Sequence, residues 1–252
     1  MITSKPRFIA PVAAPTTPGR SLVASERALA TPLVAPASAP PAYRWAKRGL
    51  DLIVAATALI ILSPLLLIIA LAIKLDDGGP VIISQRRVGL GGRVFAFYKF
   101  RSMRADMDHA AAHRAFAQAV IRGEITQGPR SNGGLLKPTG NGAVITRVGR
   151  ILRKTSLDEL PQLFNVLAGQ MSLVGPRPSL DYEAEAYYDH FLPRLSVLPG
   201  LTGLAQVNGR SSIPFADIVR WDLAYIEARS FWLDVQILRH TVSVVVRMRH
   251  TG

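Results

Sequence analysis

The hydrophobic pattern of the chain is dominated by one uncharged run, from Leu52 to Ile73, made mostly of Leu, Ile, Val and Ala. An all-round apolar segment of this length is typical of a membrane helix, whereas an apolar core helix is usually shorter. Ser63-Pro64 lies at the middle of the run, where a proline removes one backbone hydrogen bond and kinks the helix. A neighbouring serine can bond the carbonyl that the proline leaves free.

The residues around this run do not decide how it meets a membrane. Cationic residues flank both ends, so the positive-inside rule selects no side. Tyr43 and Trp45 lie where a helix would reach the membrane–water interface. Two arrangements remain open: a kinked helix that spans the bilayer, and a helix-break-helix that enters and leaves by the same face. The flanking cations are Arg44, Lys47 and Arg48 on one side and Lys74, Arg86 and Arg87 on the other.

After the run, the pattern changes to short segments with strong β-propensity. Val81–Ser84 and Val94–Phe100 are rich in β-branched and aromatic residues, and Gly89, Gly91 and Gly92 lie between them. This order predicts a β-hairpin. The glycines are a poor dinucleotide-binding signal, because no helix follows them directly. Basic residues at the end of the second strand either meet phosphate or form a solvated face: Lys99, Arg101 and Arg104.

Helical periodicity returns in the rest of the chain, and the whole predicts an α+β fold. The Gly-, Pro- and Asn-rich segment 123–142 predicts a loop, and Leu204–Arg210 predicts a short strand that ends in an Asn-Gly turn. The last predicted helix has an aliphatic face opposite several arginines, which fits either a packed helix or one that lies at a membrane interface. The segments that predict helices are 105–122, 147–154, 182–191, 215–229 and 231–250.

The segment from Leu157 to Pro178 carries the clearest chemical signal. Ser156 and Glu159 have the S-x-x-E spacing of a capping box, which predicts a helix that begins here. In that helix Asp158 and Glu159 lie in or beside the first turn, where the helix dipole and a preceding basic run favour ionised carboxylates. The helical spacing then continues through Leu160, Leu163, Phe164 and Leu167, and Gly169 marks its end.

Two interpretations of this acidic pair stay open at this point. Acidic residues in a first turn are most often simple helix caps, but an ionised Asp can also act as a nucleophile or a ligand for a hard cation. Pro161 adds a structural alternative, because proline is favoured at the first position of a helix. Asp158 and Glu159 would then lie in a turn ahead of the helix.

The composition of the chain limits which classes of function are possible. A net charge of +13 implies anionic partners, such as nucleic acid, anionic lipid or phosphorylated small molecules. The chain has no cysteine, which excludes disulfides, Cys-ligated zinc and thiol catalysis, and its five histidines show no metal-binding spacing. Residues 1–42 are rich in Pro, Ala, Ser and Thr without periodicity, which predicts a disordered tail.

Three arginines lie beside residues that form rigid turns: Arg153 before the acidic pair, Arg177 between two prolines, and Arg210 after Asn-Gly. The planar guanidinium suits phosphate oxygens, and a rigid turn holds it in place. The carboxylates Asp158 and Glu159 could together hold a divalent cation that shares its ligand shell with substrate phosphates. The residues therefore favour phosphoryl transfer at a membrane surface.

Two other function classes explain the charge without catalysis. A membrane-anchored binder of nucleic acid or another anionic partner should place its basic residues on one face with stacking aromatic residues. A non-catalytic scaffold for polysaccharide export would not need a carboxylate pair beside Arg153. The clustering of basic residues at turns around Asp158 and Glu159 favours the enzyme, and we expect no nucleic-acid partner.

The motifs of the chain, in this order, closely resemble those of the bacterial sugar transferase family, the monotopic polyprenyl-phosphate phosphoglycosyl transferases that initiate exopolysaccharide and glycoconjugate synthesis. The resemblance covers about residues 47–248, and the form is most similar to the short, single-module members that load a hexose phosphate. The matching motifs are Lys47–Asp51, Ser63-Pro64, Lys99–Met103, Ile145–Arg147, Leu152–Gln162, Ser172–Pro178 and Gln206–Arg210.

The resemblance implies a reaction and its residues. Family members move a sugar-1-phosphate from a UDP-sugar to undecaprenyl phosphate and release UMP, using Mg²⁺. Asp158 would attack the β-phosphate and form a covalent phosphosugar intermediate, and Glu159 would help to hold Mg²⁺ or assist proton movement. The positions that would bind phosphate or substrate are Lys99, Arg101, Arg153, Arg177, Gln206, Asn208 and Arg210.

The resemblance also implies an organisation in the cell. The helix break at Ser63-Pro64 favours the re-entrant arrangement, at the cytoplasmic face of the bacterial inner membrane. We therefore expect a disordered tail over residues 1–42, a re-entrant membrane helix over 43–77, and a cytoplasmic catalytic domain with membrane-associated helices over 78–252. Anionic lipids are expected partners, and self-association into a homo-oligomer is left open.

One stretch departs from the family pattern. Many relatives have Asp-Pro-Arg before Ile-Thr-Arg, whereas this chain has Asn141-Gly142-Ala143-Val144 there. The preceding loop is also long and rich in glycine. Both differences leave the identity of the sugar open, and with it the question of whether residues 123–143 form a substrate loop.

Overall fold

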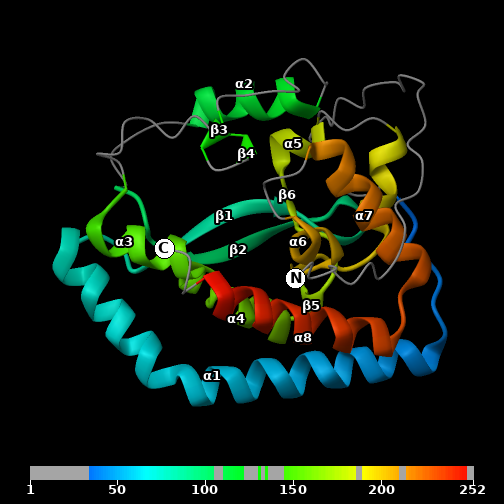
Figure 1. Cartoon of the computed structure of the whole chain (residues 1–252), viewed down its shortest axis with the longest axis horizontal. Helices are drawn as coiled ribbons and strands as arrows, with labels where there is room; N and C mark the ends of the chain where they lie inside the picture. The colour runs from blue at the N-terminus through cyan, green and yellow to red at the C-terminus, as the bar shows by residue number, and fades with distance from the viewer. Residues whose placement is uncertain are drawn as a thin grey trace, which may run out of the picture.

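One long helix, α1 (Pro41–Asp77), runs along one side of the molecule, and the other helices and strands are gathered against it (Figure 1). The computed structural model describes residues 34–104, 110–121, 130–131, 134–135, 145–185, 189–209 and 214–248. Most of the predicted tail, most of the 123–143 loop and Arg210 lie outside these residues. Residues 34–40 are described, and Ala37 donates its backbone N–H to Ser196 O at 2.7 Å.

The predicted hairpin is confirmed, with a longer first strand. Strand β1 (Ile82–Val88) pairs antiparallel with β2 (Val94–Phe100), in a register that runs from Ile82 opposite Phe100 to Val88 opposite Val94. The connection is the short turn η2 (Leu90–Gly92), in which Gly91 and Gly92 have φ of 66° and 85°. Strand β6 (Ser179–Leu180) pairs with the other edge of β1, so the strand order is β2-β1-β6.

A second, parallel pair joins β5 (Ser172–Val174) to β7 (Gly200–Thr202). The backbone of Gly175 passes so close to this pair that a Cβ on Gly200 would lie 2.1 Å from Gly175 N. Only glycine permits this approach. A third pair, β3 (Arg130–Ser131) with β4 (Gly134–Leu135), lies within the segment that the sequence predicts as a loop.

Most of the predicted helices are confirmed, with shifted ends. They are α2 (Ala110–Ile121), α3 (Arg147–Thr155), α5 (Asp181–Glu185) with the 3₁₀ segment η5 (Asp189–Ser196), α7 (Phe215–Ala228) and α8 (Phe231–Met248). The strand predicted from Leu204 is wrong. Leu204–Asn208 forms the short helix α6, in which the adjacent residues Leu204 and Ala205 are both buried and Val207 N bonds Gly203 O.

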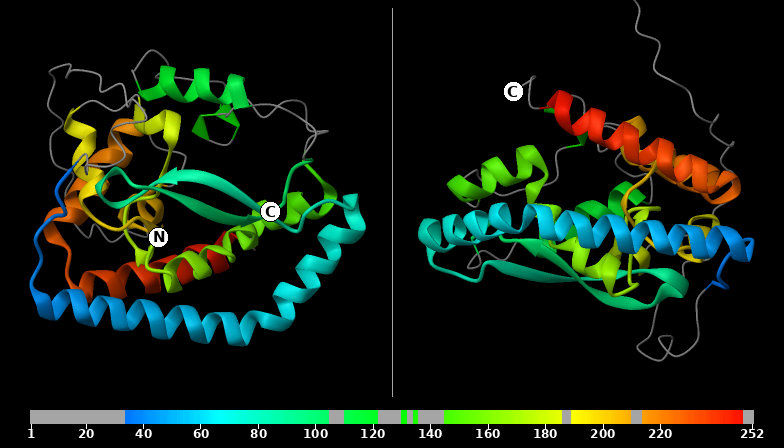
Figure 2. Two further views of the ribbon diagram at one scale, coloured as in Figure 1. Left: turned by 180° about the vertical axis from the view of Figure 1, so that it is seen from behind. Right: turned by 90° about the horizontal axis from the view of Figure 1, so that it is seen from below.

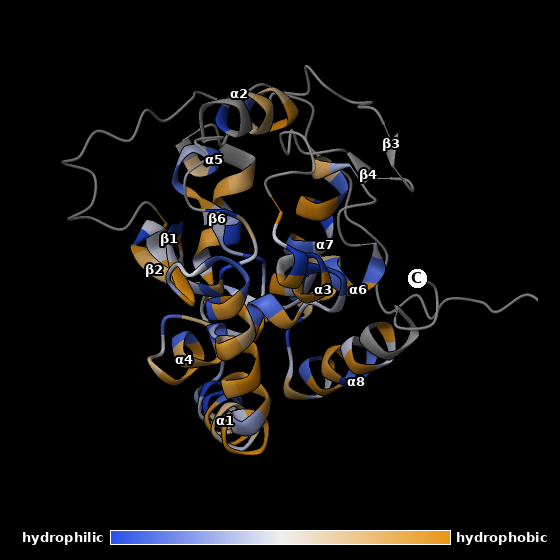
Figure 3. Ribbon diagram, turned by 90° about the vertical axis from the view of Figure 1, so that its left-hand side faces the viewer, coloured by the Kyte–Doolittle hydropathy of each residue, from blue (hydrophilic) through white to orange (hydrophobic). Residues whose placement is uncertain are grey.

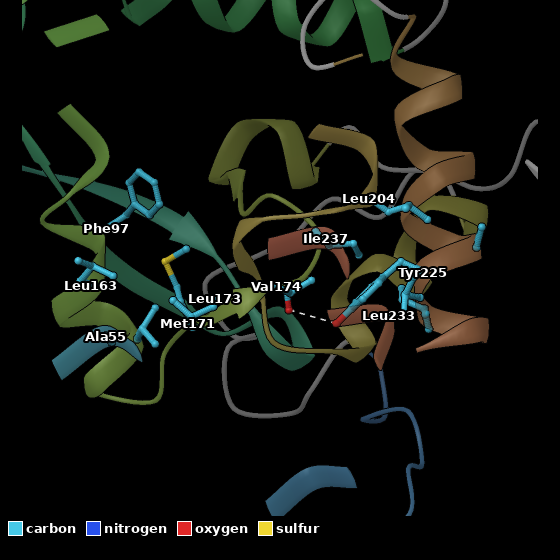
Figure 4. Packing of buried hydrophobic residues seen from close by; sticks show 13 residues of the cluster. Ala55, Phe97, Leu163, Met171, Leu173, Val174, Leu204, Tyr225, Leu233 and Ile237 are labelled. Carbon is cyan, nitrogen blue, oxygen red and sulfur yellow. Dashed lines mark hydrogen bonds between the residues drawn. The ribbon is translucent and has the colours of Figure 1, made fainter. Parts of the chain in front are cut away.

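The main hydrophobic core lies where α1, β2, α4, β5, α6, α7 and α8 meet, with α4 (Gln162–Leu167) contributing Leu163 and Val166 (Figure 4). Ala55 of α1 is fully buried in this core. The first half of α1 is therefore packed into the globular body. Figure 4 draws one polar contact of the core, the hydrogen bond from the Tyr225 hydroxyl to Val174 O at 3.2 Å.

Charged residues near the start of α1 fasten it to the body. Lys47 donates to Val174 O at 2.9 Å. Arg48 donates to Val166 O at 2.7 Å and to Leu167 O at 2.9 Å, two carbonyls at the end of α4. Asp51, only 2% exposed, accepts from Ser172 Oγ at 3.1 Å and Leu173 N at 2.9 Å. Lys47 and Arg48, which the sequence places as membrane flanks, thus bond to the protein itself.

The far end of α1 is fastened to the same body. Asp76 accepts from Val148 N at 3.0 Å, near the start of α3, and Asp77 pairs with the buried guanidinium of Arg101. Between the two ends, α1 exposes large apolar side chains, and it is long and apolar enough to cross a membrane. Figure 3 shows this apolar helix on the lower side of the molecule. Exposed residues of this kind include Ile60, Ile61, Leu67, Ile68 and Leu71.

The predicted helix break is a bend within one continuous helix. α1 runs through Pro64, and Figures 1 and 2 show it bent in its second half. Proline cannot donate to the carbonyl of Ile60, four residues earlier. Ser63 Oγ donates to that oxygen instead, at 2.8 Å, as expected for a serine beside a helical proline.

Candidate active site

The acidic pair lies in a tight turn between two helices. Helix α3 ends at Thr155, and Ser156 follows with φ 57°, in the left-handed region that is uncommon outside glycine. The predicted capping box is wrong, because the Ser156 side chain makes no capping hydrogen bond. The structural alternative is confirmed: Asp158 and Glu159 lie in the 3₁₀ turn η4 (Leu157–Glu159), and α4 begins after Pro161.

Glu159 is held by two cations. Arg177 Nη2 lies 2.6 Å from Glu159 Oε1, and Arg177 Nη1 lies 3.3 Å from Oε2, so the guanidinium contacts both carboxylate oxygens. Lys99 Nζ lies 3.3 Å from Oε1. Burial raises the pKa of Glu159, but the charges of Arg177 and Lys99 outweigh it and lower this pKa to about 2. Glu159 is therefore ionised, as the sequence predicts.

Asp158 has a different environment although it is the adjacent residue. It is 8% exposed, and its Oδ2 lies 3.9 Å from Lys99 Nζ. Burial raises the pKa of Asp158, Lys99 acts against this rise, and the neighbouring charge of Glu159 adds to it. The expectation that the surroundings favour ionisation of both carboxylates is therefore wrong for Asp158, because burial is the larger effect. The turn thus holds one carboxylate saturated by cations and one that is desolvated and less firmly paired.

The contact between the turn and strand β2 is set by Asn165 of α4. Its Oδ1 accepts from Tyr98 N at 3.1 Å, and its Nδ2 donates to Ala96 O at 2.7 Å. The fully buried amide therefore pairs with the edge of β2 as a neighbouring strand would. This fixes α4, and the turn before it, beside Lys99. Burial and the nearby charge of Arg177 lower the pKa of Lys99.

Arg177 is placed by the loop that follows β5. Gly175 N bonds Thr202 O at 2.9 Å and Gly200 N bonds Pro176 O at 2.8 Å, so both sides of the loop are tied to the β7 region. Arg194 Nη2 approaches Arg177 O at 3.5 Å, and Arg194 itself forms a buried ion pair with Asp222 at 2.8 Å. The guanidinium of Arg177 extends from a rigid backbone, as its position between two prolines predicts.

The other residues that the sequence predicts for the site do not all lie beside the two carboxylates. Arg153 lies in the last turn of α3, donates to Met103 Sδ at 3.3 Å, and is near enough for its charge to lower the pKa of Asp158. Arg101 is engaged by Asp77 at the end of α1 and is not brought to the carboxylates. Gln206 Nε2 donates to Leu201 O and Asn208 Nδ2 to Leu204 O, both close in the chain. The phosphate-binding roles of these residues stay predictions.

The residues of the site fit a divalent cation held by one carboxylate and by substrate phosphates better than a cation held by a cluster of protein ligands. Among the described residues, no group of three or more His, Asp or Glu side chains could hold a metal ion. Lys99 lies between the two carboxylates, and Arg177 covers both oxygens of Glu159. The donor set thus suits Mg²⁺ held mainly by Asp158 and completed by phosphate oxygens and water, as is common for this ion.

Three functional features were missed by the sequence analysis. The buried pair Arg194–Asp222 supports the Arg177 loop, but its members are 28 positions apart and carry no local pattern. The sequence places Lys47 as a membrane flank and within the Lys47–Asp51 motif, but it does not predict the ion pair of Lys47 with Asp234 at 2.9 Å. Arg87 was counted as a flank too, whereas the hairpin register places it on the same face as Lys99. That register was predictable in principle, since residues two apart along a strand share a face.

The fold and the site together define a protein with a bent apolar helix and a buried carboxylate turn set among arginine and lysine side chains, which is chemistry suited to phosphate. The family model for bacterial sugar transferases matches residues 42–248, and the chain belongs to that family.

Several curated relatives are similar over most of the chain. It is 42% identical to the undecaprenyl-phosphate galactose phosphotransferase of Salmonella typhimurium over 81% of this chain and 41% of the relative. It is 42% identical to a UDP-glucose:undecaprenyl-phosphate glucose-1-phosphate transferase of Xanthomonas campestris over 77% and 37%. It is 36% identical to the exopolysaccharide production protein ExoY of Rhizobium meliloti over 83% and 89%. The chain thus spans about two fifths of the first two relatives and most of the third.

Proposed function

We propose that this protein transfers a sugar-1-phosphate from a UDP-sugar to undecaprenyl phosphate, releases UMP, and so performs the first membrane step of exopolysaccharide or glycoconjugate synthesis. The observation that carries the proposal is the contrast between Asp158 and Glu159: one carboxylate is buried and only loosely paired, and its neighbour is neutralised by Arg177 and Lys99. The relatives include galactose and glucose phosphotransferases, which supports a hexose as the sugar.

The reaction proceeds in two displacements. Asp158 attacks the β-phosphorus of the UDP-sugar, and a new bond forms between a carboxylate oxygen and phosphorus. The bond from the β-phosphorus to the bridging oxygen breaks, and UMP leaves with that oxygen. The phosphate oxygen of undecaprenyl phosphate then attacks the same phosphorus and displaces Asp158 as a free carboxylate. Because the two displacements are separate steps, a soluble nucleotide sugar and a membrane-held acceptor can react at the same nucleophile one after the other.

The cations around the turn explain why Asp158 and not Glu159 attacks. Glu159 is engaged at both oxygens by Arg177, so its electron pairs are not free to reach phosphorus. Glu159 instead holds Arg177 and Lys99 beside the reacting phosphate, where the charges of these two side chains stabilise the developing negative charge. Arg153, whose charge also acts on Asp158, lies in the last turn of α3 just before the acidic turn and helps to neutralise the leaving phosphate.

Mg²⁺, held mainly by Asp158 with substrate oxygens, would neutralise phosphate charge and polarise the reacting phosphoryl group. Among the described residues, Lys99 supplies the nearest protein cation to Asp158 Oδ2, at 3.9 Å. Burial excludes water from Asp158, which protects an acyl phosphate from hydrolysis.

The membrane arrangement that we propose is re-entrant, with both ends of α1 on the cytoplasmic face of the bacterial inner membrane. It is supported by the contacts at the two ends. Arg48 and Asp51 fasten the start of α1 to α4 and β5, and Asp76 and Asp77 fasten its end to α3 and Arg101. A helix held to one body at both ends cannot place its ends on opposite sides of a bilayer. Exposed Ile151, Phe164 and Trp232 offer further apolar contact with lipid.

The direct test is release of UMP by the purified full chain in detergent, given Mg²⁺, undecaprenyl phosphate and one UDP-sugar at a time. The proposal expects UMP and lipid-linked sugar phosphate in equal amounts with at least one UDP-hexose, and none with Asp158→Asn. Asp217→Asn is the matched control, since Asp217 pairs on the surface with Arg220 at 3.1 Å. A folded wild type that releases no UMP from any UDP-sugar would contradict the proposal.

A further inference from the structure

Arg87 lies on the face of the hairpin that looks toward the acidic turn. It is opposite Phe95 in the register of β1 and β2, so it shares a face with Phe97 and Lys99. Its guanidinium lies over the Phe97 ring at 5.1 Å, and Lys99 Nζ lies over the same ring at 5.5 Å. Two cations, Arg87 and Lys99, thus lie against the same aromatic ring, and Lys99 also contacts Glu159.

The charge of Arg87 is buried without a counter-charge. The residue is 9% exposed. Its Nη1 donates to Pro178 O at 3.1 Å and its Nη2 to Gln85 Oε1 at 3.2 Å, and both acceptors are neutral. Its Nε is buried and has no hydrogen-bond partner. Within the described part of the chain, Arg87 forms no ion pair.

The nearest carboxylates are already engaged by other groups. Glu159 is held by Arg177 and Lys99, and Glu183 accepts from Leu180 N at 2.8 Å. Burial and the like charge of Arg177 lower the pKa of Arg87 to about 10. Two guanidinium groups therefore meet at the Arg177–Pro178 loop, and of the two only Arg177 forms an ion pair with Glu159. A buried cation that lacks a partner is costly unless an anion binds there.

We propose that Arg87 is a phosphate-binding residue of the substrate site, one that acts together with Arg177 and Lys99 on an oxyanion held beside Asp158. The inference rests on the proposed function and adds a residue and a ligand class to it. The free Nε and the adjacent Nη form the fork that guanidinium offers to phosphate oxygens. The shared chemistry is a phosphate group, which either the nucleotide diphosphate or the polyprenyl phosphate can supply.

The test compares Arg87→Met and Arg87→Lys with Arg86→Met in the purified full chain. Arg86 is the matched control because it is adjacent, carries the same charge, and is exposed on the opposite face, with only a 3.8 Å contact to Asp181. UDP binding is measured by calorimetry and by the rise in Tm that UDP causes, and KM is measured for undecaprenyl phosphate. Arg87→Lys keeps the charge and serves if Arg87→Met does not fold.

The expected result is a loss of at least tenfold for Arg87→Met on one substrate and a change below twofold for Arg86→Met. A weaker Kd for UDP assigns the phosphate to the nucleotide, and a higher KM for undecaprenyl phosphate at unchanged UDP affinity assigns it to the lipid. Arg87→Lys should lose less than Arg87→Met on the same substrate. The unliganded Tm of Arg87→Met should be unchanged or higher, because a buried unpaired charge has been removed.

A structural role for Arg87 predicts the reverse pattern: a lower unliganded Tm with UDP affinity and lipid KM within twofold of wild type, which would overturn the inference. Failure of the proposed function can be distinguished from failure of the Arg87 inference, because the wild type itself would then release no UMP. In that case the inference still stands if Arg87→Met loses the Tm rise that UDP gives the wild type. It falls if UDP gives the wild type no such rise.

Discussion

The guanidinium of Arg177 and the carboxylate of Glu159 meet in a two-point contact, with Nη2–Oε1 at 2.6 Å and Nη1–Oε2 at 3.3 Å. The contact joins the loop after β5, which carries the basic side of the site, to the turn before α4, which carries the acidic side. In the reaction that we propose, this contact removes Glu159 from competition with Asp158, because both oxygens of Glu159 are occupied. The different roles proposed for the two adjacent carboxylates follow from this one pair.

Arg177→Lys should lose much more activity than a change that keeps the charge suggests. A lysine offers a single ammonium and cannot contact both oxygens of Glu159 from a rigid loop. We expect kcat/KM for the UDP-sugar to fall roughly 10- to 100-fold, about 1.4–2.8 kcal/mol of transition-state stabilisation. Arg86→Lys, on the exposed side of β1, should stay within twofold. Near-normal kinetics for Arg177→Lys would indicate a purely electrostatic role.

The stability of the fold at acid pH should depend on Glu159. Its pKa is lowered from 4.5 to about 2, so the ionised carboxylate stabilises the fold above about pH 4.5, and this contribution is lost as pH falls toward 2. Glu159→Gln should lower the free energy of unfolding at neutral pH by on the order of 1–3 kcal/mol, because Arg177 and Lys99 lose their partner.

The measurement is thermal unfolding in detergent from pH 7 to pH 2.5. The Tm of wild type should fall more steeply below pH 4.5 than the Tm of Glu159→Gln, so the two curves converge in acid. Glu227→Gln, at an exposed position near the end of α7, should run parallel to wild type. Parallel curves for Glu159→Gln and wild type would refute the assigned interaction.

The two ends of α1 should be accessible from the same side of the membrane. The chain has no native cysteine, so single cysteines at Ala42 and Ser84, both exposed, report on each end. An impermeant maleimide should label neither in intact spheroplasts and both in inverted vesicles. Labelling of one position alone in spheroplasts would establish a span. Pro64→Ala restores the backbone bond to Ile60 and should favour a straight helix, shifting one end toward the opposite side.

Gly149→Ala should separate α3 from the end of the hairpin. A Cβ at Gly149 would lie 2.1 Å from Ser102 O, a backbone atom that cannot move aside as a side chain could. We expect a loss of about 1–3 kcal/mol in the free energy of unfolding. UMP release should fall too, since α3 leads directly into the acidic turn. Gly49→Ala is the control: nothing lies within 4 Å of its added Cβ, and alanine should be neutral or stabilising in α1.

Local patterns predicted much of the fold. The β-branched and aromatic residues on either side of Gly89–Gly92 predicted the hairpin, the periodicity predicted α7 and α8, and Ser63-Pro64 predicted both the bend and the bond to Ile60 O. These features depend on neighbours in the chain. The left-handed Ser156 and the short helix at Leu204 depend on distant packing, and the local signals there pointed to a capping box and a strand.

The residues of the site also fall into two groups, those that local sequence predicts and those whose position depends on distant packing. Residue types and spacing predicted Asp158, Glu159 and Arg177, because rigid turns and paired charges are visible in sequence. The separation of Lys99 from Arg101 was not visible: strand β2 ends at Phe100, Lys99 meets the carboxylates, and Arg101 turns to Asp77. In the sequence Lys47 resembles a membrane flank, whereas in the fold it bonds to Val174 O of β5 and pairs with Asp234 of α8.

The intact mass of the protein after incubation with a UDP-hexose and Mg²⁺, without any lipid acceptor, tests the central claim most directly. If Asp158 is the nucleophile, wild type gains the mass of one hexose phosphate, releases one equivalent of UMP, and returns to its original mass when undecaprenyl phosphate is added. Asp158→Asn gains nothing, and Asp217→Asn behaves as wild type. No adduct on wild type, together with kinetics that require both substrates bound at once, would mean that the acceptor phosphate attacks directly and that Asp158 is only a cation ligand.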